Sequence, residues 1–130
     1  EQLAEEMPAS FDIVCCLEML EHVPDPAAVI AACAEMARPG ASLYFSTINR
    51  NPKAFALMIV GAEHILKLLP AGTHEYTKFI KPSELASWCR AAGLVMTDMT
   101  GLTYNPISKR YRLNPRDVGV NYMVRAEKPA

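Results

Sequence analysis

Phe11-Asp12-Ile13-Val14-Cys15-Cys16-Leu17 is the stretch that decides the fold of this 130-residue chain. Apart from its single aspartate the run is apolar, which is typical of a parallel strand covered on both faces rather than of a half-exposed strand. We therefore predict a central strand at residues 11–17.

A helix and a second strand follow this run. Asp25 is the predicted N-cap and Pro26 the first helical residue, and apolar residues recur at helical spacing until Arg38-Pro39-Gly40 ends the helix. The β-rich run 42–48 comes next. Strand, helix and strand in this order predict a βαβ unit with a right-handed crossover, and hence an α/β fold.

The rest of the chain continues with helices and strands. A long apolar helix is predicted at residues 53–69, ended by Pro70-Ala71-Gly72-Thr73-His74, and a further helix opens at Pro82. Extended stretches are predicted at residues 76–80, 94–100 and 121–128. Alternation in the last stretch indicates an antiparallel strand at or near the sheet edge.

Composition excludes several classes of protein. With 51% hydrophobic and 21% charged residues, the chain is typical of one soluble globular domain. A net charge of −1 without a long basic run argues against a nucleic-acid partner. The four cysteines show no C-x-x-C spacing, and the sequence has neither a signal peptide nor a long apolar span, so we expect a reduced, cytoplasmic location.

Glu18, Glu21 and His22 are the candidate chemical residues, because they follow a predicted buried strand at positions i, i+3 and i+4. If a helical turn follows Leu17, these side chains share one face and could hold a divalent ion such as Mg²⁺, with His74 as a fourth ligand. His22 is alternatively a general base. The structural alternative is a solvated first turn, where glutamates are favoured in any case.

The helix predicted at 53–69 has two interpretations. Its apolar block is too short and too polar to span a bilayer, but with Lys53, Lys67, Lys78 and Lys81 nearby it suits the surface of an anionic membrane. The alternative is a lid over the active site or a contact with a partner subunit. Periodicity cannot distinguish lipid from protein as the apolar partner.

Several motifs resemble the second half of class I S-adenosylmethionine-dependent methyltransferases, a Rossmann-like fold, and among these the ubiquinone-biosynthesis O-methyltransferases in particular. The family methylates hydroxyl groups of a polyprenylated quinone precursor. The resemblance extends from about residue 11 to residue 128 and is carried by residues 16–26, 45–50, 60–66, 72–74, 78–85, 101–106 and 120–123.

This resemblance implies a partial methyltransferase domain over residues 1–130, holding strands four to seven with their helices and an inserted apolar helix and loop at 50–82. It implies S-adenosylmethionine as cofactor, with Cys16, Leu17 and Met19 lining its pocket, although such residues are more often simply core. It also implies a polyprenylated phenol as substrate and a ubiquinone-biosynthesis complex as partner. A similar Glu-x-x-Glu-His pattern in small-RNA methyltransferases of the same fold supports the magnesium interpretation.

One expected part is missing from the sequence. The family's glycine-rich cofactor loop has no counterpart, since no Gly-x-Gly-x-Gly occurs, and the chain starts without methionine, so we expect an inactive fragment of a longer enzyme. Two alternatives remain: a methyltransferase for another small phenol or metabolite, and a catalytically silent module that binds a membrane or a partner.

Overall fold

The computed structural model describes residues 1–68, 70–73 and 75–130, and it contains one five-stranded sheet in the order β1-β2-β5-β3-β4. The strands are β1 (Phe11–Leu17), β2 (Ala37–Ile48), β3 (Val95–Asn105), β4 (Arg110–Asn114) and β5 (Asn121–Glu127). The α-helices are α1 (Gln2–Glu6), α2 (Pro26–Met36), α3 (Pro52–Ala54) and α4 (Pro82–Ala91). Short 3₁₀ turns are η1 (Leu20–His22) and η3 (Tyr76–Lys78), and η2 (Phe55–Ile65) is a π-helix that continues α3.

The predicted βαβ unit is confirmed by β1, α2 and β2. Strands β1 and β2 are parallel, with Leu17 opposite Ser46. Helix α2 begins where the sequence indicates, because the Asp25 side chain accepts a hydrogen bond from the Ala28 N–H at 3.1 Å. It ends at Met36, and the residues predicted as a turn, Arg38-Pro39-Gly40, already belong to the irregular start of β2.

The second half of the sheet differs from the prediction in two respects. Strand β5 is antiparallel to its neighbours, as expected, but it lies between β2 and β3 rather than at the edge. The edge is formed by β4, which pairs with an extended β3 as a hairpin. This hairpin was missed because its residues show neither a clear apolar alternation nor a tight two-residue turn signal.

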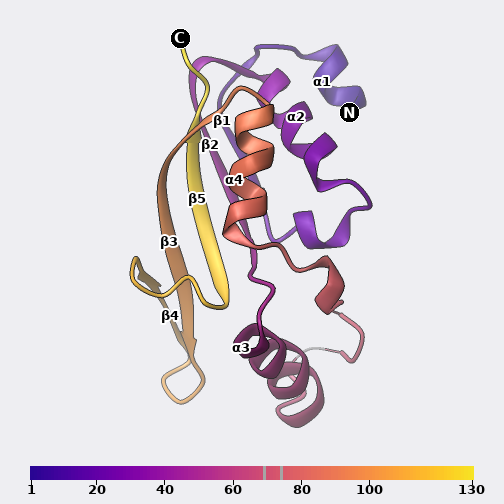
Figure 1. Cartoon of the computed structure of the whole chain (residues 1–130), viewed down its shortest axis with the longest axis vertical. Coiled ribbons are helices and arrows are strands. Elements are labelled where there is room, and N and C mark those ends of the chain that lie inside the picture. Colours follow the sequence, from indigo (N-terminus) through magenta and orange to yellow (C-terminus); the bar gives the residue numbers. More distant parts are fainter. Residues whose placement is uncertain (69, 74) are drawn as a thin grey trace.

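Helices cover one face of the sheet (Figure 1). Val14 and Cys16 of β1, Phe45 of β2 and Tyr122 of β5 point to this face and form the main core with α2 and α4. Cys15 and its neighbours two residues before and after it are exposed on the other face. The prediction of a central strand covered on both faces is therefore wrong for the described residues, since none of them pairs with the outer side of β1 or covers its second face.

The described residues of segment 50–82, called the lobe below, lie mainly at one end of the molecule around the helix α3–η2 (Figure 1). Its helix is shorter than predicted and ends at Ile65. Tyr76 lies between the rings of Phe55 and Phe79, at centroid distances of 5.4 and 5.6 Å. This packing accompanies the 3₁₀ turn η3, where the sequence predicted an extended stretch.

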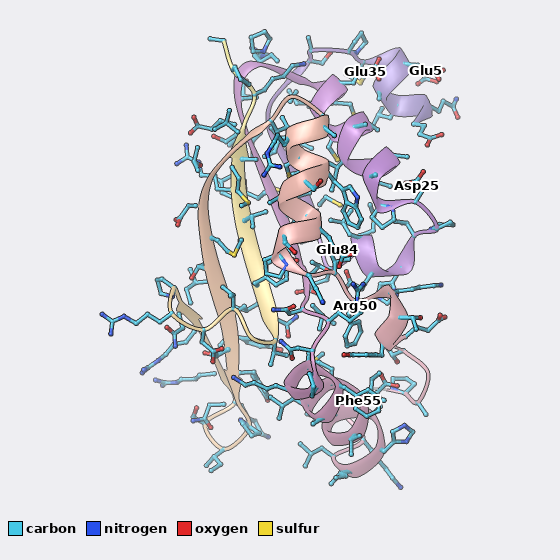
Figure 2. The ribbon with its side chains drawn as sticks, in the orientation of Figure 1. Glu5, Asp25, Glu35, Arg50, Phe55 and Glu84 are labelled. Atoms are coloured by element: carbon cyan, nitrogen blue, oxygen red, sulfur yellow. The ribbon has the colours of Figure 1, made fainter. Side chains whose placement is uncertain are left out.

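Arg50 joins this lobe to the main core, and Figure 2 shows it close to Glu84 at the start of α4. Its guanidinium lies 2.8 Å from the Glu84 carboxylate and donates a hydrogen bond to the Phe79 carbonyl. The buried Tyr122 hydroxyl donates to the Ile80 carbonyl at 2.7 Å. These contacts fix the loop after η3 against the sheet.

Candidate functional site

A polar cluster lies where the parallel strands β1 and β2 end. Carboxyl ends of parallel strands meet at one edge of a sheet, which is where open α/β folds bind ligands. Glu18 follows β1 directly, Ser46 and Thr47 are close to the end of β2, and Asn121 begins β5 opposite Ile48. Residues distant in sequence are thereby brought to one place.

Glu18 is held by its backbone and by its carboxylate. Its φ of 51° is in the left-handed region, which is uncommon for a residue other than glycine and often accompanies functional positions. Its N–H donates to the carbonyl and the hydroxyl oxygen of Ser46, at 3.0 and 3.1 Å. Its Oε1 accepts a hydrogen bond from Asn121 Nδ2 at 3.1 Å. The carboxylate is therefore directed toward the start of β5.

Glu21 is a buried acid, with only 3% of its surface exposed. Its Oε2 accepts a hydrogen bond from the Thr47 hydroxyl at 2.8 Å, and its Oε1 lies 3.8 Å from Nε2 of His22. The imidazole is half exposed, so it lies between the buried carboxylate and solvent.

The two glutamates influence one another. Burial raises the pKa of the Glu18 carboxyl to about 7, and the charge of Glu21 and a hydrogen bond between the two carboxyl groups act in the same direction. Hydrogen bonds from Asn121 and Ser46 partly oppose this rise. Although Glu18 as a whole residue is exposed, its carboxyl group is partly surrounded by protein atoms, and this partial burial raises the pKa.

The predicted metal geometry is only partly present. The helical turn assumed after Leu17 begins three residues later, at Leu20, and Glu18 is left-handed, so the i, i+3, i+4 helical face is not formed. The two carboxylates still meet. Within residues 1–68, 70–73 and 75–130, no three histidine, cysteine or acidic side chains are grouped so that they could hold a metal ion. His74, the predicted fourth ligand, lies outside the described residues.

The residues predicted to contact a cofactor have different environments. Cys16 is buried in the main core, where a hydrogen bond with Cys33 and burial raise the pKa of its thiol, so it is a neutral core residue. Leu17 and Met19 are exposed next to the polar cluster. Their positions leave both side chains accessible to a ligand at this edge.

Ser46, Thr47 and Asn121 were not identified as site residues from the sequence. Ser46 and Thr47 could have been found from the sequence, because they are hydroxyl residues close to the end of an apolar strand. In an α/β fold that end of the strand lies at the edge of the sheet where ligands bind. Asn121 had no comparable signal, since only the antiparallel pairing of β5 with β2 brings it to Glu18.

No helix within the described part of the chain is both long and apolar enough to pass through a bilayer.

Comparison with protein families gives a match over residues 1–98 to a model described as a methyltransferase domain. Curated relatives are similar over nearly the whole chain. The chain is 61% identical over 128 residues to a ubiquinone biosynthesis O-methyltransferase of Saccharophagus degradans, a match that covers 98% of this chain and 54% of the relative. It is 64% identical over 129 residues to the protein of the same name from Hahella chejuensis, with 99% and 54% covered. The chain thus spans about half the length of these relatives.

Solved structures share the fold at low sequence identity. A SAM-dependent methyltransferase of Thermotoga maritima, described as a possible histamine N-methyltransferase, is 17% identical with a TM-score of 0.68, and the match covers 94% of this chain and 58% of that one. A SAM-dependent methyltransferase of Methanosarcina mazei is 17% identical with a TM-score of 0.60, with 95% and 61% covered. These similarities support the methyltransferase fold and nothing finer.

Proposed function

Because this chain belongs to the methyltransferase-domain family, we propose that the protein containing it transfers a methyl group from S-adenosylmethionine to a phenolic hydroxyl of a polyprenylated ubiquinone precursor. The observation that carries this proposal is the 61–64% identity, over nearly the whole chain, to proteins named ubiquinone biosynthesis O-methyltransferase. The activity is proposed for a protein of the relatives' full length.

The polar cluster suits the deprotonation that this reaction requires. An unperturbed phenol has a pKa of about 10, so its oxygen is a poor nucleophile at neutral pH unless a group accepts its proton. His22 accepts that proton as the oxygen attacks the methyl carbon. The O–CH₃ bond forms while the S–CH₃ bond breaks, and the bonding pair remains on sulfur. Glu21, held by Thr47, stabilises the resulting imidazolium.

Orientation of the phenol is the second task of the cluster. Glu18 and Asn121 are already hydrogen-bonded to one another across the end of the sheet. Both side chains can replace part of this contact with hydrogen bonds to the hydroxyl groups of the ring. These hydrogen bonds orient the attacking oxygen. No covalent intermediate with the protein is needed.

S-adenosylmethionine supplies an electrophilic methyl group when it is bound. Leu17 and Met19 present apolar side chains at the ligand edge and fit contact with part of such a cofactor, whereas Cys16 is directed into the core. The glycine-rich loop that would approach its methionine moiety is absent from this sequence. We therefore assign to Leu17 and Met19 a contact role only.

A magnesium ion is a further part of the proposal, supported by the chemistry of two adjacent carboxylates, whose hard oxygens are the ligands that Mg²⁺ prefers. The described residues do not complete such a site, because Glu18 and Glu21 lack a third acidic or histidine ligand grouped with them there. No step of the reaction is assigned to the ion.

Contact with a membrane surface is proposed for the lobe at 50–82. Phe55 and Leu57 expose large apolar side chains on the helix, while the opposite side, with Met58, packs against the second core cluster. Lys53 and Lys78 belong to the same segment but are paired with Asp117 and Glu75, so the exposed apolar side chains carry this proposal. A substrate with a long isoprenoid tail partitions into lipid, so an enzyme for it benefits from binding there.

The proposed function is tested with the full-length protein, isotopically labelled S-adenosylmethionine and a polyprenylated catechol. We expect O-methylated product, and we expect His22→Gln to lower kcat by about 10²- to 10⁴-fold, the usual contribution of a general base. Leu3→Glu, on α1 at the other end of the molecule (Figure 1), is the control and should leave kcat unchanged. Product formed only from an unrelated small phenol would contradict the proposed substrate.

A further inference from the structure

An apolar cavity of about 360 Å³ lies between the helix α3–η2 and the end of the sheet. Leu57 and Met58 of the helix line it together with Leu66, which directly follows the helix. Leu102, Tyr104 and Val120 line it from the sheet side. The volume is within the usual range of small-molecule sites, which are mostly apolar with a few polar groups. The cavity is therefore large enough for part of an apolar ligand.

The inner end of this cavity reaches the polar cluster. Asn121 lines the cavity, and the same side chain donates its hydrogen bond to Glu18. Asn121 is also paired with Leu102 across β5 and β3, so an apolar wall residue lies next to the polar contact. A ligand with a polar head at the cluster would thus extend directly into apolar surroundings.

The outer end leads to exposed apolar side chains. Leu57, Leu66 and Leu68 line the cavity and are each more than half exposed. The path from Asn121 to these residues is consequently apolar along most of its length. It ends on the same helix that carries the exposed Phe55, labelled in Figure 2.

Charged groups in the cavity wall are already paired. Lys53 Nζ lies 3.3 Å from Asp117 Oδ1, and this carboxylate also accepts a hydrogen bond from the Gly119 N–H. The ion pair links α3 to the loop before β5 and fixes the width of the cavity. A charged ligand would have to compete with it, whereas a hydrocarbon would not.

We propose that this cavity binds the first isoprene units of a prenylated phenol, with the ring at Glu18, His22 and Asn121. The inference rests on the proposed function and adds to it the place of the tail. A branched hydrocarbon chain matches the apolar wall, and the continuity through Asn121 places its attachment point next to the ring. The cavity thereby contributes to selection of prenylated over plain phenols.

The test uses Leu102→Trp and Met58→Trp in the full-length protein, since each fills the cavity from a different side. Kinetics are measured with a phenol carrying a short, water-soluble prenyl tail and with the same phenol without a tail, so that membrane contact is not involved. We expect kcat/KM for the tailed phenol to fall at least tenfold, because loss of even one methylene contact costs roughly that much, and kcat/KM for the tail-less phenol to stay unchanged.

Val95→Trp is the matched control, because Val95 lies on the same strand as Leu102, is exposed, and is at the opposite end from the cavity. It should change neither value. Unchanged kcat/KM for the tailed phenol in both cavity variants would overturn the proposal, and so would an equal fall for both phenols.

A binding experiment separates this inference from the proposed activity. A phenol whose short tail carries a diazirine is photolysed with the full-length protein, and labelled peptides are mapped by mass spectrometry. Labels on residues 57–58, 102 and 120 that are lost in Leu102→Trp support the tail site even if no methyl transfer is seen. Labels elsewhere, or labelling equal to that of a tail-less diazirine phenol, would overturn it.

Discussion

Glu18 and Glu21 determine the chemistry of the cluster at the scale of single residues. They differ in environment, because Glu21 is buried and bonded to Thr47 whereas Glu18 is bonded to Asn121 at the surface of the cluster. Burial raises the pKa of the Glu18 carboxyl, and the nearby carboxylate of Glu21 adds to this rise because two close carboxylates disfavour ionisation of both. A proton, a cation or the hydroxyl of a substrate relieves the repulsion between the two carboxylates. The pair is therefore suited to binding such groups.

Glu18→Gln is expected to stabilise the protein at pH 8 but not at pH 4. The pKa of Glu18 rises from its ordinary 4.5 to about 7 on folding, so the folded state binds more protons between these values and loses stability as pH rises through 7. Glutamine keeps an acceptor for Asn121 and does not ionise. We expect its Tm to exceed that of the wild type by about 2–4 °C at pH 8.

The measurement is a thermal melt of both proteins from pH 4 to pH 8. Glu5→Gln, on α1 far from the cluster, is the matched control (Figure 2). A Tm difference between Glu18→Gln and wild type that is the same at all pH values would contradict the raised pKa.

Glu21→Gln tests the metal at the same scale. If Glu21 contributes a ligand oxygen, the variant loses the gain in methylation rate that added Mg²⁺ gives the full-length protein, because an amide is a weaker ligand than a carboxylate. The assay is a magnesium titration of the initial rate with and without the substitution. Magnesium dependence that remains equal in the two proteins would exclude a metal role for Glu21.

The α3–η2 helix has two different sides at the scale of elements. Met58 and Ile59 pack toward the second core cluster, while Phe55, Leu57 and Val60 are exposed. The helix also forms one wall of the cavity that reaches Asn121. An element in this position can connect a membrane surface with the polar cluster.

Phe55→Glu combined with Leu57→Glu is expected to abolish flotation of the full-length protein with vesicles containing anionic lipid. Two charges on the exposed side of the helix oppose insertion into the interface and repel the headgroups. Leu3→Glu places the same charge on an exposed leucine of α1 and should float as the wild type does. Undiminished flotation of the double variant would remove the membrane role of this helix.

An uncovered sheet face characterises the molecule as a whole. Among the described residues, α1, α2 and α4 lie on one side of the sheet, and β1 is an edge strand with Ile13 and Leu17 exposed. Exposed apolar edge strands pair readily with other chains. The chain also spans only about half the length of its curated relatives.

Self-association of the 130-residue chain is therefore expected to increase with concentration. Ile13→Lys combined with Leu17→Lys should reduce it, because charges on an edge strand oppose strand pairing. Sedimentation velocity over a range of concentrations measures the effect, with a reducing agent present because Cys15 is exposed. A chain that remains monomeric at every concentration would contradict the expectation that the edge strand β1 pairs with other copies.

The sequence by itself determined the βαβ unit, the resemblance to a methyltransferase family and the candidates Glu18, Glu21 and His22. These follow from local patterns: apolar runs, an Asp-Pro helix start and closely spaced polar residues. Only the tertiary structure decided that Thr47 holds Glu21, that Asn121 reaches Glu18, and that β4 rather than β5 forms the edge. The Thr47–Glu21 contact joins residues 26 positions apart and the Asn121–Glu18 contact residues 103 positions apart, and the place of β5 inside the sheet requires its pairing with the distant β2. Such pairing is governed by packing of the whole sheet, which no local pattern encodes.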